Sequence, residues 1–349
     1  MKFLIVTGCG EPQYSTNASL IAAFKALGCE VWVCGPGYWD RCFADAEMPD
    51  RPYPERYTYR EVLDLCPWSP DLILQIEPHF FLSGPKPQGV KSGFLFTDPH
   101  RGGAMQYQMA KEGHFDYVFV GQKYFLPLFF DVAPRVYSLP VGFDSRRIQR
   151  DHSQTPLVDI SFCGQTGIAF MEYLYEDDIG RYATHPPARL PAGPERYKFS
   201  IHPGYDYAER AEMLIRLCRD FSVRMYEPIL YNERYQQTLQ VGVVGFHRSL
   251  LKDISIRCFE VMAAGRVLIT DRVPFQEELF QDSYHCLTYD TYFKPFFQNF
   301  DLEYEQVAAQ VRQILRSSDK GGSLALRGQD WVWQGHTWKH RAQTLLDSL

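Results

Sequence analysis

The stretch "DISIRCFEVMAAGRVLITD", Asp253–Asp271, contains the repeating unit from which the fold is built. Arg257 and Glu260 stand three residues apart in an amphipathic run, Gly265 closes that run, and the apolar letters "VLIT" follow at once. The pattern predicts a short helix from about Ser255, a glycine stop and a buried strand. Arginine and glutamate at this spacing also form ordinary ion pairs on helix surfaces, so the rest of the chain must decide what this pair does.

The same alternation of apolar and helical patterns continues toward the N-terminus. "KFLIVTG", "STNASLIAAFKALG" and "CEVWVCG" predict a strand, a helix that stops at Gly28, and a second strand. This β-α-β order predicts parallel strands. Further strands are expected at "DLILQIE", "SGFLFTD", "DYVFVG" and "RVYSLP", with helices at "GGAMQYQMAKEG" and "QKYFLPLFF".

Beyond a linker near residues 144–156 the pattern restarts. "LVDISFCG", "FSVRMYE", "VGVVGF" and "RVLITD" predict strands, and "YDYAERAEMLIRLC" and "NERYQQTLQ" predict helices between them. The tail has two helical stretches, "LEYEQVAAQVRQILRSS" and "GSLALRGQDWVWQGHTWKHRAQTLLDSL". We therefore predict an α/β protein with two Rossmann-like, doubly wound domains. The expected boundaries are 1–150, 151–335 with a proline-rich insertion at about 168–204, and a C-terminal helix at 336–349.

Composition excludes several classes of protein. The 349 residues are 45% hydrophobic and 22% charged, as in ordinary globular proteins. A net charge of −6 without a cluster of lysine and arginine argues against nucleic acid as a partner. The nine cysteines include no C-x-x-C pair and predict reduced thiols rather than a zinc site or a disulfide framework. No stretch approaches the ~20 apolar residues of a membrane span, so we expect a cytoplasmic protein without a transmembrane segment.

Residues at strand ends are the first candidates for a binding site. In open parallel sheets, ligands bind beyond the carboxyl ends of the strands. The candidates in the second half are Gly164, Gln165, Thr166, Tyr226, Glu227, His247 and Ser249. Those in the first half are Gly8, Gly10, His79, Asp98 and His100.

Several motifs of the second half together resemble a known family. "DISFCG", "VRMYE", "SIRCFEVMAAGRVLITD", "EELF" and "HTWKHRAQTLL" resemble the spore-maturation CgeB-like branch of the GT-B glycosyltransferases, which is related to the retaining glycosyltransferase group 4. "YSLPVGFD" resembles the segment before that family's interdomain linker. The resemblance is strongest over about residues 158–349, and only the combination of motifs is specific. It implies a GT-B fold, in which two Rossmann-like domains face a central cleft.

The resemblance also implies a nucleotide-sugar site around the opening stretch. In such enzymes, the glutamate that Glu260 matches accepts hydrogen bonds from the ribose hydroxyls, and the helix start, here at Ser255, faces the diphosphate. A carboxylate is an acceptor only, which suits a diol, and a helix N-terminus favours an anion. Arg257 would then neutralise the diphosphate. The family has a further glutamate eight residues earlier, where this chain has Lys252, a cation that suits phosphate instead.

The segment "FTDPHRGG" holds the main candidates for acid and base chemistry. Asp98 or His100 would take the proton of the acceptor hydroxyl, and His79 is a second candidate for this role. The alternative is that Asp98 caps the following helix and His100 is a solvated loop residue. His336 and Arg341, which match the closing motif, are expected to hold the terminal helix by packing and hydrogen bonds.

Two other patterns lead to weaker hypotheses. Gly8 and Gly10 begin a dinucleotide-binding fingerprint, but its third position is Gln13 and the strand end "VWVCG" has no ribose-binding acid. We prefer a tight turn that approaches the donor phosphate or the acceptor, with a plain packing turn as the alternative. The sequence contains no D-x-D motif, so we expect no metal site, and the acidic run at 176–178 is interpreted as a solvated face.

The sequence thus predicts a glycosyltransferase that moves a sugar from a nucleotide-diphosphate donor to an acceptor hydroxyl. We expect no cofactor and no required metal, and the resemblance somewhat favours retention of the anomeric configuration. A nucleotide-sugar epimerase on the same fold and a catalytically silent nucleotide-sugar-binding protein are the alternatives, with an NAD-dependent dehydrogenase further away. The donor base, the sugar, the acceptor and the oligomeric state do not follow from the sequence.

Overall fold

Both large sheets of the computed structural model consist of strands that run parallel to their neighbours. Each sheet is the centre of one compact unit. Unit 1 contains residues 1–141 and 338–349, and unit 2 lies between residues 142 and 337. The structure describes residues 1–8, 16–36, 44–49, 51–52, 55–76, 80–97, 103–151, 154–166, 204–226, 235–250, 253–291 and 300–349.

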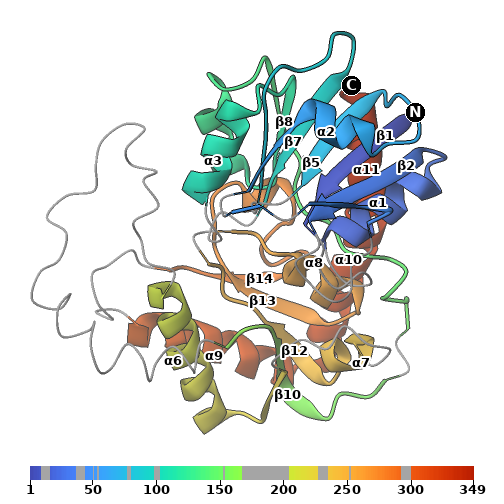
Figure 1. Cartoon of the computed structure of the whole chain (residues 1–349). Helices are drawn as coiled ribbons and strands as arrows, with labels where there is room; N and C mark the ends of the chain where they lie inside the picture. The colour runs from blue at the N-terminus through green and yellow to red at the C-terminus, as the bar shows by residue number, and fades with distance from the viewer. Residues whose placement is uncertain are drawn as a thin grey trace, which may run out of the picture. The chain divides into compact units, whose positions relative to one another are not determined.

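Unit 1 is built on a seven-stranded sheet with the order β3-β2-β1-β5-β7-β8-β9 (Figure 1). The order reverses at β1, as it does in doubly wound sheets. Its central strands are continuous apolar runs because both of their faces are buried. The elements of the sheet and its helices are β1 (Lys2–Thr7), α1 (Thr16–Ala26), β2 (Glu30–Pro36), β3 (Ala46–Met48), β5 (Leu72–Ile76), β7 (Lys91–Phe96), α3 (Gly103–Glu112), β8 (Tyr117–Val120), η1 (Lys123–Phe129) and β9 (Arg135–Ser138).

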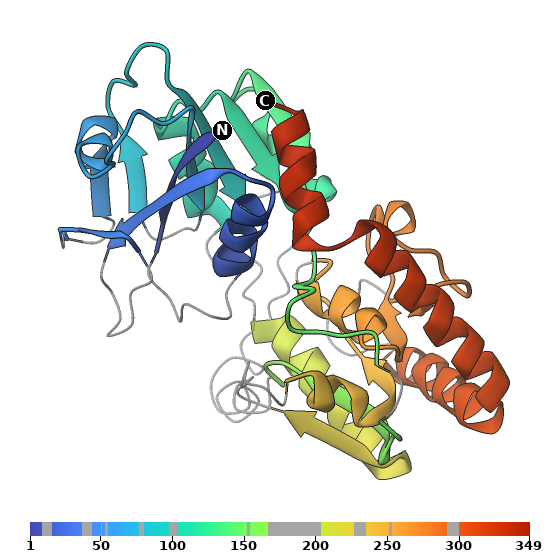
Figure 2. The same cartoon turned by 90° about the vertical axis from the view of Figure 1, so that its right-hand side faces the viewer.

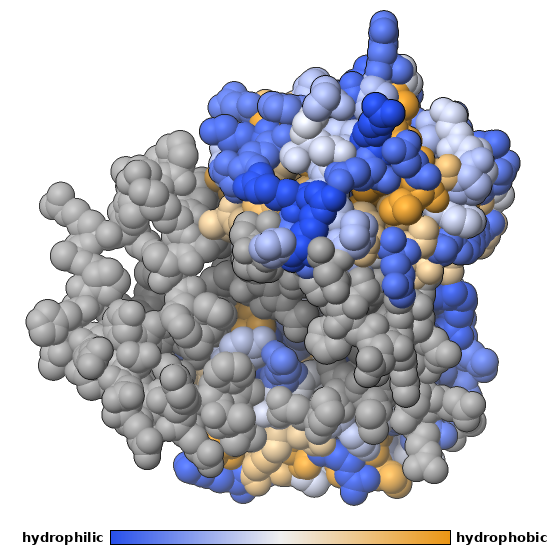
Figure 3. All heavy atoms as spheres, viewed as in Figure 1, coloured by the Kyte–Doolittle hydropathy of each residue, from blue (hydrophilic) through white to orange (hydrophobic). Residues whose placement is uncertain are grey.

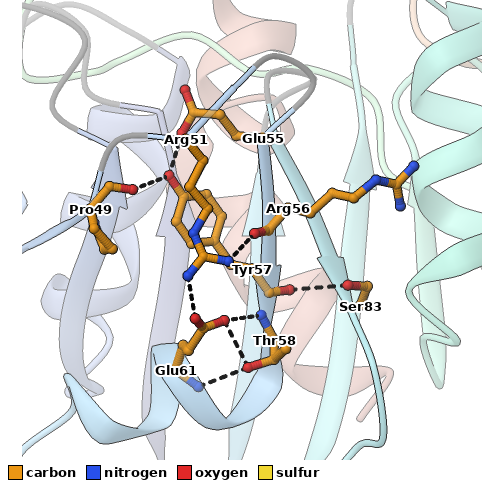
Figure 4. A network of polar contacts seen from close by, with 8 residues as sticks. All are labelled: Pro49, Arg51, Glu55, Arg56, Tyr57, Thr58, Glu61 and Ser83. Carbon is orange, nitrogen blue, oxygen red and sulfur yellow. Dashed lines mark hydrogen bonds and ion pairs between the residues drawn. The ribbon is translucent and has the colours of Figure 1, made fainter.

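A small parallel pair of strands, β4 (Glu55–Thr58) and β6 (Phe80–Ser83), also belongs to unit 1. It leads into α2 (Tyr59–Asp64), which begins with a capping box (Figure 4). The Glu61 N–H donates to Thr58 Oγ1 at 3.2 Å, and the Thr58 N–H donates to Glu61 Oε2 at 2.7 Å. The Thr58 N–H and an ion pair with Arg51 lower the pKa of Glu61 to about 2.

Unit 2 is built on a five-stranded sheet with the order β11-β10-β12-β13-β14. The strand order reverses at β10, so the β-α-β prediction is confirmed for this half as well. The elements of unit 2 are β10 (Val158–Cys163), α6 (Gly204–Asp220), β11 (Val223–Tyr226), α7 (Tyr235–Gln240), β12 (Gly242–Phe246), α8 (Ile256–Ala263), β13 (Val267–Asp271), η3 (Gln276–Glu278), β14 (Leu287–Tyr289), α9 (Phe300–Arg316) and α10 (Ser318–Gly335).

The C-terminal tail is divided between the two units. The helical pattern predicted for its last 28 letters is two helices, α10 and α11 (Trp338–Asp347), separated by His336 and Thr337. Thr337 forms a bridge with Phe143 in unit 2, which interrupts the helix. After this break α11 packs against α1 in unit 1, so the last helix lies beside the first (Figure 2). In unit 1, the Arg341 Nε–H donates to the carbonyl of Val141 at 3.1 Å.

The other differences from the predicted elements are local. The helix expected at "QKYFLPLFF" is the 3-10 helix η1, which contains Pro127. Most of the expected insertion at 168–204 lies outside the described residues. In the view of Figure 3, the described surface is mostly hydrophilic, with apolar side chains in small separate patches. Among the residues that the structure describes, no helix is long and apolar enough to cross a membrane.

Candidate functional site

Glu260 is the most distinctive charged residue of unit 2 because it is only 1% exposed. It lies on α8, which begins at the N-cap Ser255 and is followed by Gly265 with a φ of 74°. Its Oε2 atom accepts the Tyr235 hydroxyl proton at 2.5 Å and forms an ion pair with Arg257. Among the described residues, none is in hydrogen-bond contact with the other oxygen, Oε1. The carboxylate therefore keeps one acceptor atom for a donor from outside the described chain.

Two arginines stabilise the buried charge of this carboxylate. Burial raises the pKa of Glu260, and the positive charges of Arg257 and Arg147 oppose that shift. Arg147 in turn lies 3.5 Å from the carboxylate of Asp144. The guanidinium of Arg257 lies over the ring of Tyr235, with its Cζ atom 5.3 Å from the ring centre. The alternative of a surface ion pair between Arg257 and Glu260 is wrong in one respect, since the pair exists but is buried.

The start of α8 is tied to the end of β12. Ser255 Oγ lies 2.8 Å from His247 Nε2 and accepts the Arg257 N–H at 3.2 Å. His247 Nδ1 lies 3.1 Å from Thr270 Oγ1. The Cys258 N–H donates to the carbonyl of Ser255 at 3.1 Å. Two of the N–H groups expected to face an anion are thus already used inside the chain, while Ser255 itself remains partly exposed.

His247 is buried, and its ring is held on both sides. Burial and the positive charge of Arg210 lower the pKa of His247 to about 4, while the charge of Asp271 opposes that shift. The imidazole is therefore neutral near pH 7. Asp271, at the end of β13, accepts the Ser249 N–H at 2.7 Å and also the Ser249 hydroxyl. His247 and Ser249 therefore connect strand ends of unit 2, and His247 is 4% exposed and Ser249 7%.

The loop after β10 forms a second group of contacts. Gly164 has a φ of 150° and donates its N–H to the carbonyl of Tyr226 at 3.2 Å, which joins the ends of β10 and β11. The buried Arg210 of α6 donates to the carbonyls of Gln165 at 3.0 Å and of Arg248 at 2.5 Å. These bonds join the ends of β10 and β12, while the side chain of Gln165 is exposed.

The predicted site residues fall into three sets. The structure brings Ser255, Arg257 and Glu260 together on α8, and it places His247 in contact with Ser255. Gly164, Gln165, Thr166, Tyr226 and Ser249 lie at or beyond strand ends of the same unit, whereas Gly8 is buried after β1 in unit 1. Six residues lie outside the described residues: Gly10, His79, Asp98, His100, Glu227 and Lys252.

Sequence reasoning missed four residues that hold this site. Asp271 ends a predicted strand, so the strand-end rule would have found it. Tyr235 and Arg210 meet their partners only through the packing of α7 and α6, and no sequence spacing indicates this. Arg147 lies three residues after the segment "YSLPVGFD", and no role was assigned to this arginine from the sequence. In the part of the chain that the structure describes, no group of three or more His, Cys, Asp or Glu side chains is arranged to hold a metal ion.

Comparison with protein families gives one match. Residues 188–347, a little under half of the chain, match the family described as "Glycosyl transferase-like". Most of the site described above, including α8 and Glu260, lies within the matched residues. A comparison with curated proteins finds none that matches this sequence.

Comparison with solved structures covers the whole chain. Sucrose-phosphate synthase of Thermosynechococcus elongatus has a TM-score of 0.59 at 12% identity, over 99% of this chain and 97% of that one. HepE of Anabaena, in complex with UDP and glucose, has a TM-score of 0.59 at 13% identity, over 99% and 98%. An E. coli structure described as trehalose-6-phosphate bound with UDP-2-fluoro glucose has the same score, identity and shares. The predicted GT-B fold is confirmed, and together with the family match these likenesses support a glycosyltransferase enzyme.

Proposed function

We propose that the protein transfers a sugar from a nucleoside diphosphate sugar to an acceptor hydroxyl, with the nucleotide bound by unit 2. One observation carries the proposal. The Glu260 side chain is almost fully buried, Tyr235 and Arg257 donate to one of its oxygens, and the other oxygen has no hydrogen-bond partner among the described residues. A chain retains such a carboxylate at a cost in stability, and a vicinal diol, as in ribose, supplies the donors that it lacks.

Uridine diphosphate is the first nucleotide to test. The HepE structures contain UDP or UDP-glucose, and the E. coli structure contains UDP-2-fluoro glucose. At 13% identity these likenesses concern the fold. The base, the sugar and the CgeB-like affiliation are part of the proposal, and UDP is its first probe.

The leaving diphosphate would be met by cations of unit 2 and by the partly exposed Ser255 at the start of α8. Arg257 is the described cation next to Glu260, and Lys252, outside the described residues, is the second one proposed. Because these groups supply positive charge, we propose that transfer does not require a metal. Retention of configuration is the outcome that we propose from the resemblance to group 4. The stereochemistry of the product, read by NMR, tests it.

The acceptor chemistry is proposed for Asp98 or His100, with His79 as the reserve. In the reaction, the bond between the anomeric carbon and the diphosphate oxygen breaks, and the acceptor oxygen bonds to that carbon on the face from which the diphosphate departs, so that the configuration is retained. The acceptor proton then passes to a base. Asp98→Asn and His100→Ala should be compared for turnover and for nucleotide affinity. Loss of turnover by about 10²- to 10⁴-fold at constant affinity in one of them would support the assignment. Normal turnover in both would remove it.

Thermal unfolding with UDP, GDP, TDP, ADP and NAD, each in EDTA and in magnesium, tests the nucleotide part of the proposal. A ligand at 100 times its dissociation constant adds about 2.7 kcal/mol to the free energy of unfolding. We expect a nucleoside diphosphate to stabilise the protein in both buffers. Stabilisation only in magnesium would contradict metal independence, and stabilisation by NAD alone would favour a dehydrogenase.

A turnover assay separates the remaining alternatives. Conversion of the donor without an acceptor would favour an epimerase, and nucleotide binding without any turnover would favour a silent binding protein.

A further inference from the structure

We infer that Tyr235 is a positioning residue that sets the orientation of Glu260 toward the ribose and thereby determines the preference for ribose over 2′-deoxyribose. The inference rests on the proposed function. Tyr235 is 2% exposed and is the first residue of α7, a helix with no other proposed role at the site. Its hydroxyl donates a hydrogen bond to Glu260 Oε2 at 2.5 Å. The contact joins two helices 25 residues apart in the sequence.

Tyr235 and Arg257 donate hydrogen bonds to the same oxygen of Glu260. Both donate their hydrogen bonds to Oε2 and not to Oε1. Arg257 lies three residues from Glu260 on the same helix, so it moves with the carboxylate that it neutralises. Of the two described donors, only Tyr235 belongs to another element. The tyrosine hydroxyl is therefore the contact that distinguishes the two carboxylate oxygens and keeps Oε1 available for a ligand.

Tyr235 also orders the arginine. The Arg257 guanidinium lies over its ring, with 5.3 Å between Cζ and the ring centre, which favours the cation electrostatically. Loss of the hydroxyl alone would leave this contact, because phenylalanine keeps the ring. Tyr235→Phe therefore removes the bond to Glu260 and spares the support of Arg257.

The backbone of Tyr235 is anchored to the end of β10. The Thr238 hydroxyl donates to the carbonyl of Tyr235 at 2.7 Å, and the thiol of Cys163, the last residue of β10, donates to Thr238 Oγ1 at 3.6 Å. A residue that locates a ligand group must itself be held, and here the strand holds it through α7. Glu260 thus has a second support from the sheet, through α7, besides the one that its own helix gives.

A ribose diol offers two hydroxyl donors, whereas 2′-deoxyribose offers one. If Oε1 accepts one of these hydroxyls in a defined direction, UDP binds more tightly than 2′-deoxy-UDP. A hydrogen bond to a charged group corresponds to a preference of about tenfold or more. If the Glu260 carboxylate can rotate, its hydrogen bond to the second hydroxyl is weaker, and the preference for UDP over 2′-deoxy-UDP falls. A purely structural role for Tyr235 would lower stability and leave the ratio of the two affinities unchanged.

Calorimetric titration of the full chain with UDP and with 2′-deoxy-UDP tests the inference. The variants are Tyr235→Phe, Glu260→Gln and Tyr304→Phe. Tyr304 is the matched control because its hydroxyl also donates to a carboxylate at 2.5 Å, that of Asp220, and an arginine also lies over its ring. We expect Tyr235→Phe to lower UDP affinity about tenfold and to change 2′-deoxy-UDP affinity less than about threefold. The Tyr304→Phe variant should bind both nucleotides like the wild type. If Tyr235→Phe does not fold, Tyr235→Leu is compared with Tyr304→Leu, because each removes a hydroxyl together with a ring beside an arginine.

The outcomes separate the two levels of the account. A ratio that collapses in both Tyr235→Phe and Glu260→Gln supports the positioning role. A ratio that collapses in Glu260→Gln and persists in Tyr235→Phe overturns that role and leaves the proposed function in place. If the wild type binds GDP or ADP instead of UDP, the ratio is measured with that nucleotide and its 2′-deoxy form. A wild type that binds none of the three, or a Glu260→Gln variant with an unchanged ratio, contradicts the ribose contact itself and the inference with it.

Discussion

Ser255 Oγ and His247 Nε2 lie 2.8 Å apart, and this contact joins the N-cap of α8 to the end of β12. The other ring nitrogen of His247 lies 3.1 Å from Thr270 Oγ1 on β13. A single buried imidazole thus ties the helix that carries Glu260 to two strands of the sheet. The site is therefore coupled to the protonation state of His247, because a protonated ring has no acceptor nitrogen.

We predict that unit 2 loses stability as the pH falls from about 6.5 to about 4 because of His247. Burial lowers its pKa to about 4 in the folded state, while the unfolded chain binds the proton near the ordinary value of 6.5. The unfolded state holds more protons in this window, so acidification favours it, by about 3 kcal/mol in total for a shift of this size. Denaturant titrations of the wild type and of His247→Gln across this range provide the measurement. Parallel pH profiles for the two proteins would rule out this source.

Substitution by alanine at two glycines of the same helix should change the free energy of unfolding in opposite directions. In α10, a Cβ at Gly328 would lie 2.5 Å from the carbonyl oxygen of His285, whereas a Cβ at Gly322 has no atom within 4 Å. Gly322→Ala should raise the free energy of unfolding by about 0.5 to 1 kcal/mol, since glycine is the poorer helix former. Gly328→Ala should lower it, because backbone must move. The prediction fails if thermal unfolding shifts both variants in the same direction.

The sheets were predictable because their strands are continuous apolar runs between helical periods. The short strands β3, β4, β6 and β14 were missed because they lie in connecting segments, outside the regular alternation of strand and helix patterns. The break at His336 and Thr337 was missed as well, because it depends on a bridge to Phe143 nearly two hundred residues earlier. No local pattern predicts such a contact, and the transfer of α11 to unit 1 follows from it.

The site was predictable to the extent that its residues share one helix. Arg257 and Glu260 are three residues apart, so their contact follows from helical geometry. Burial of the pair and the role of Tyr235 depend on how α7 packs, which the sequence does not encode at any fixed spacing. The candidates for the base, Asp98, His100 and His79, lie outside the described residues, so their assignment stays a prediction.

Nucleotide binding should weaken in acid, at a pH above the usual pKa of a glutamate. Burial raises the pKa of Glu260, so its carboxylate takes up a proton at a higher pH than a solvated one. A protonated carboxyl loses acceptor capacity for the ribose diol, and UDP affinity should fall as the pH drops through that raised pKa. Titrations carried from neutral pH into the acid range should show this fall in the wild type. The Glu260→Gln variant corrects for titration of the diphosphate itself, and an identical pH profile in both proteins would contradict the prediction.

Calorimetric titration of UDP into the wild type, Glu260→Gln and Glu305→Gln tests the central claim most directly. Glu305 is an exposed glutamate of α9 in the same unit, so its substitution makes the same change of charge on another helix. We predict that Glu260→Gln binds UDP more weakly by about 1.5 to 3 kcal/mol, the range for a hydrogen bond to a charged group, and that Glu305→Gln matches the wild type. Equal affinity in all three proteins would contradict the assignment of Glu260 as the residue that holds the nucleotide.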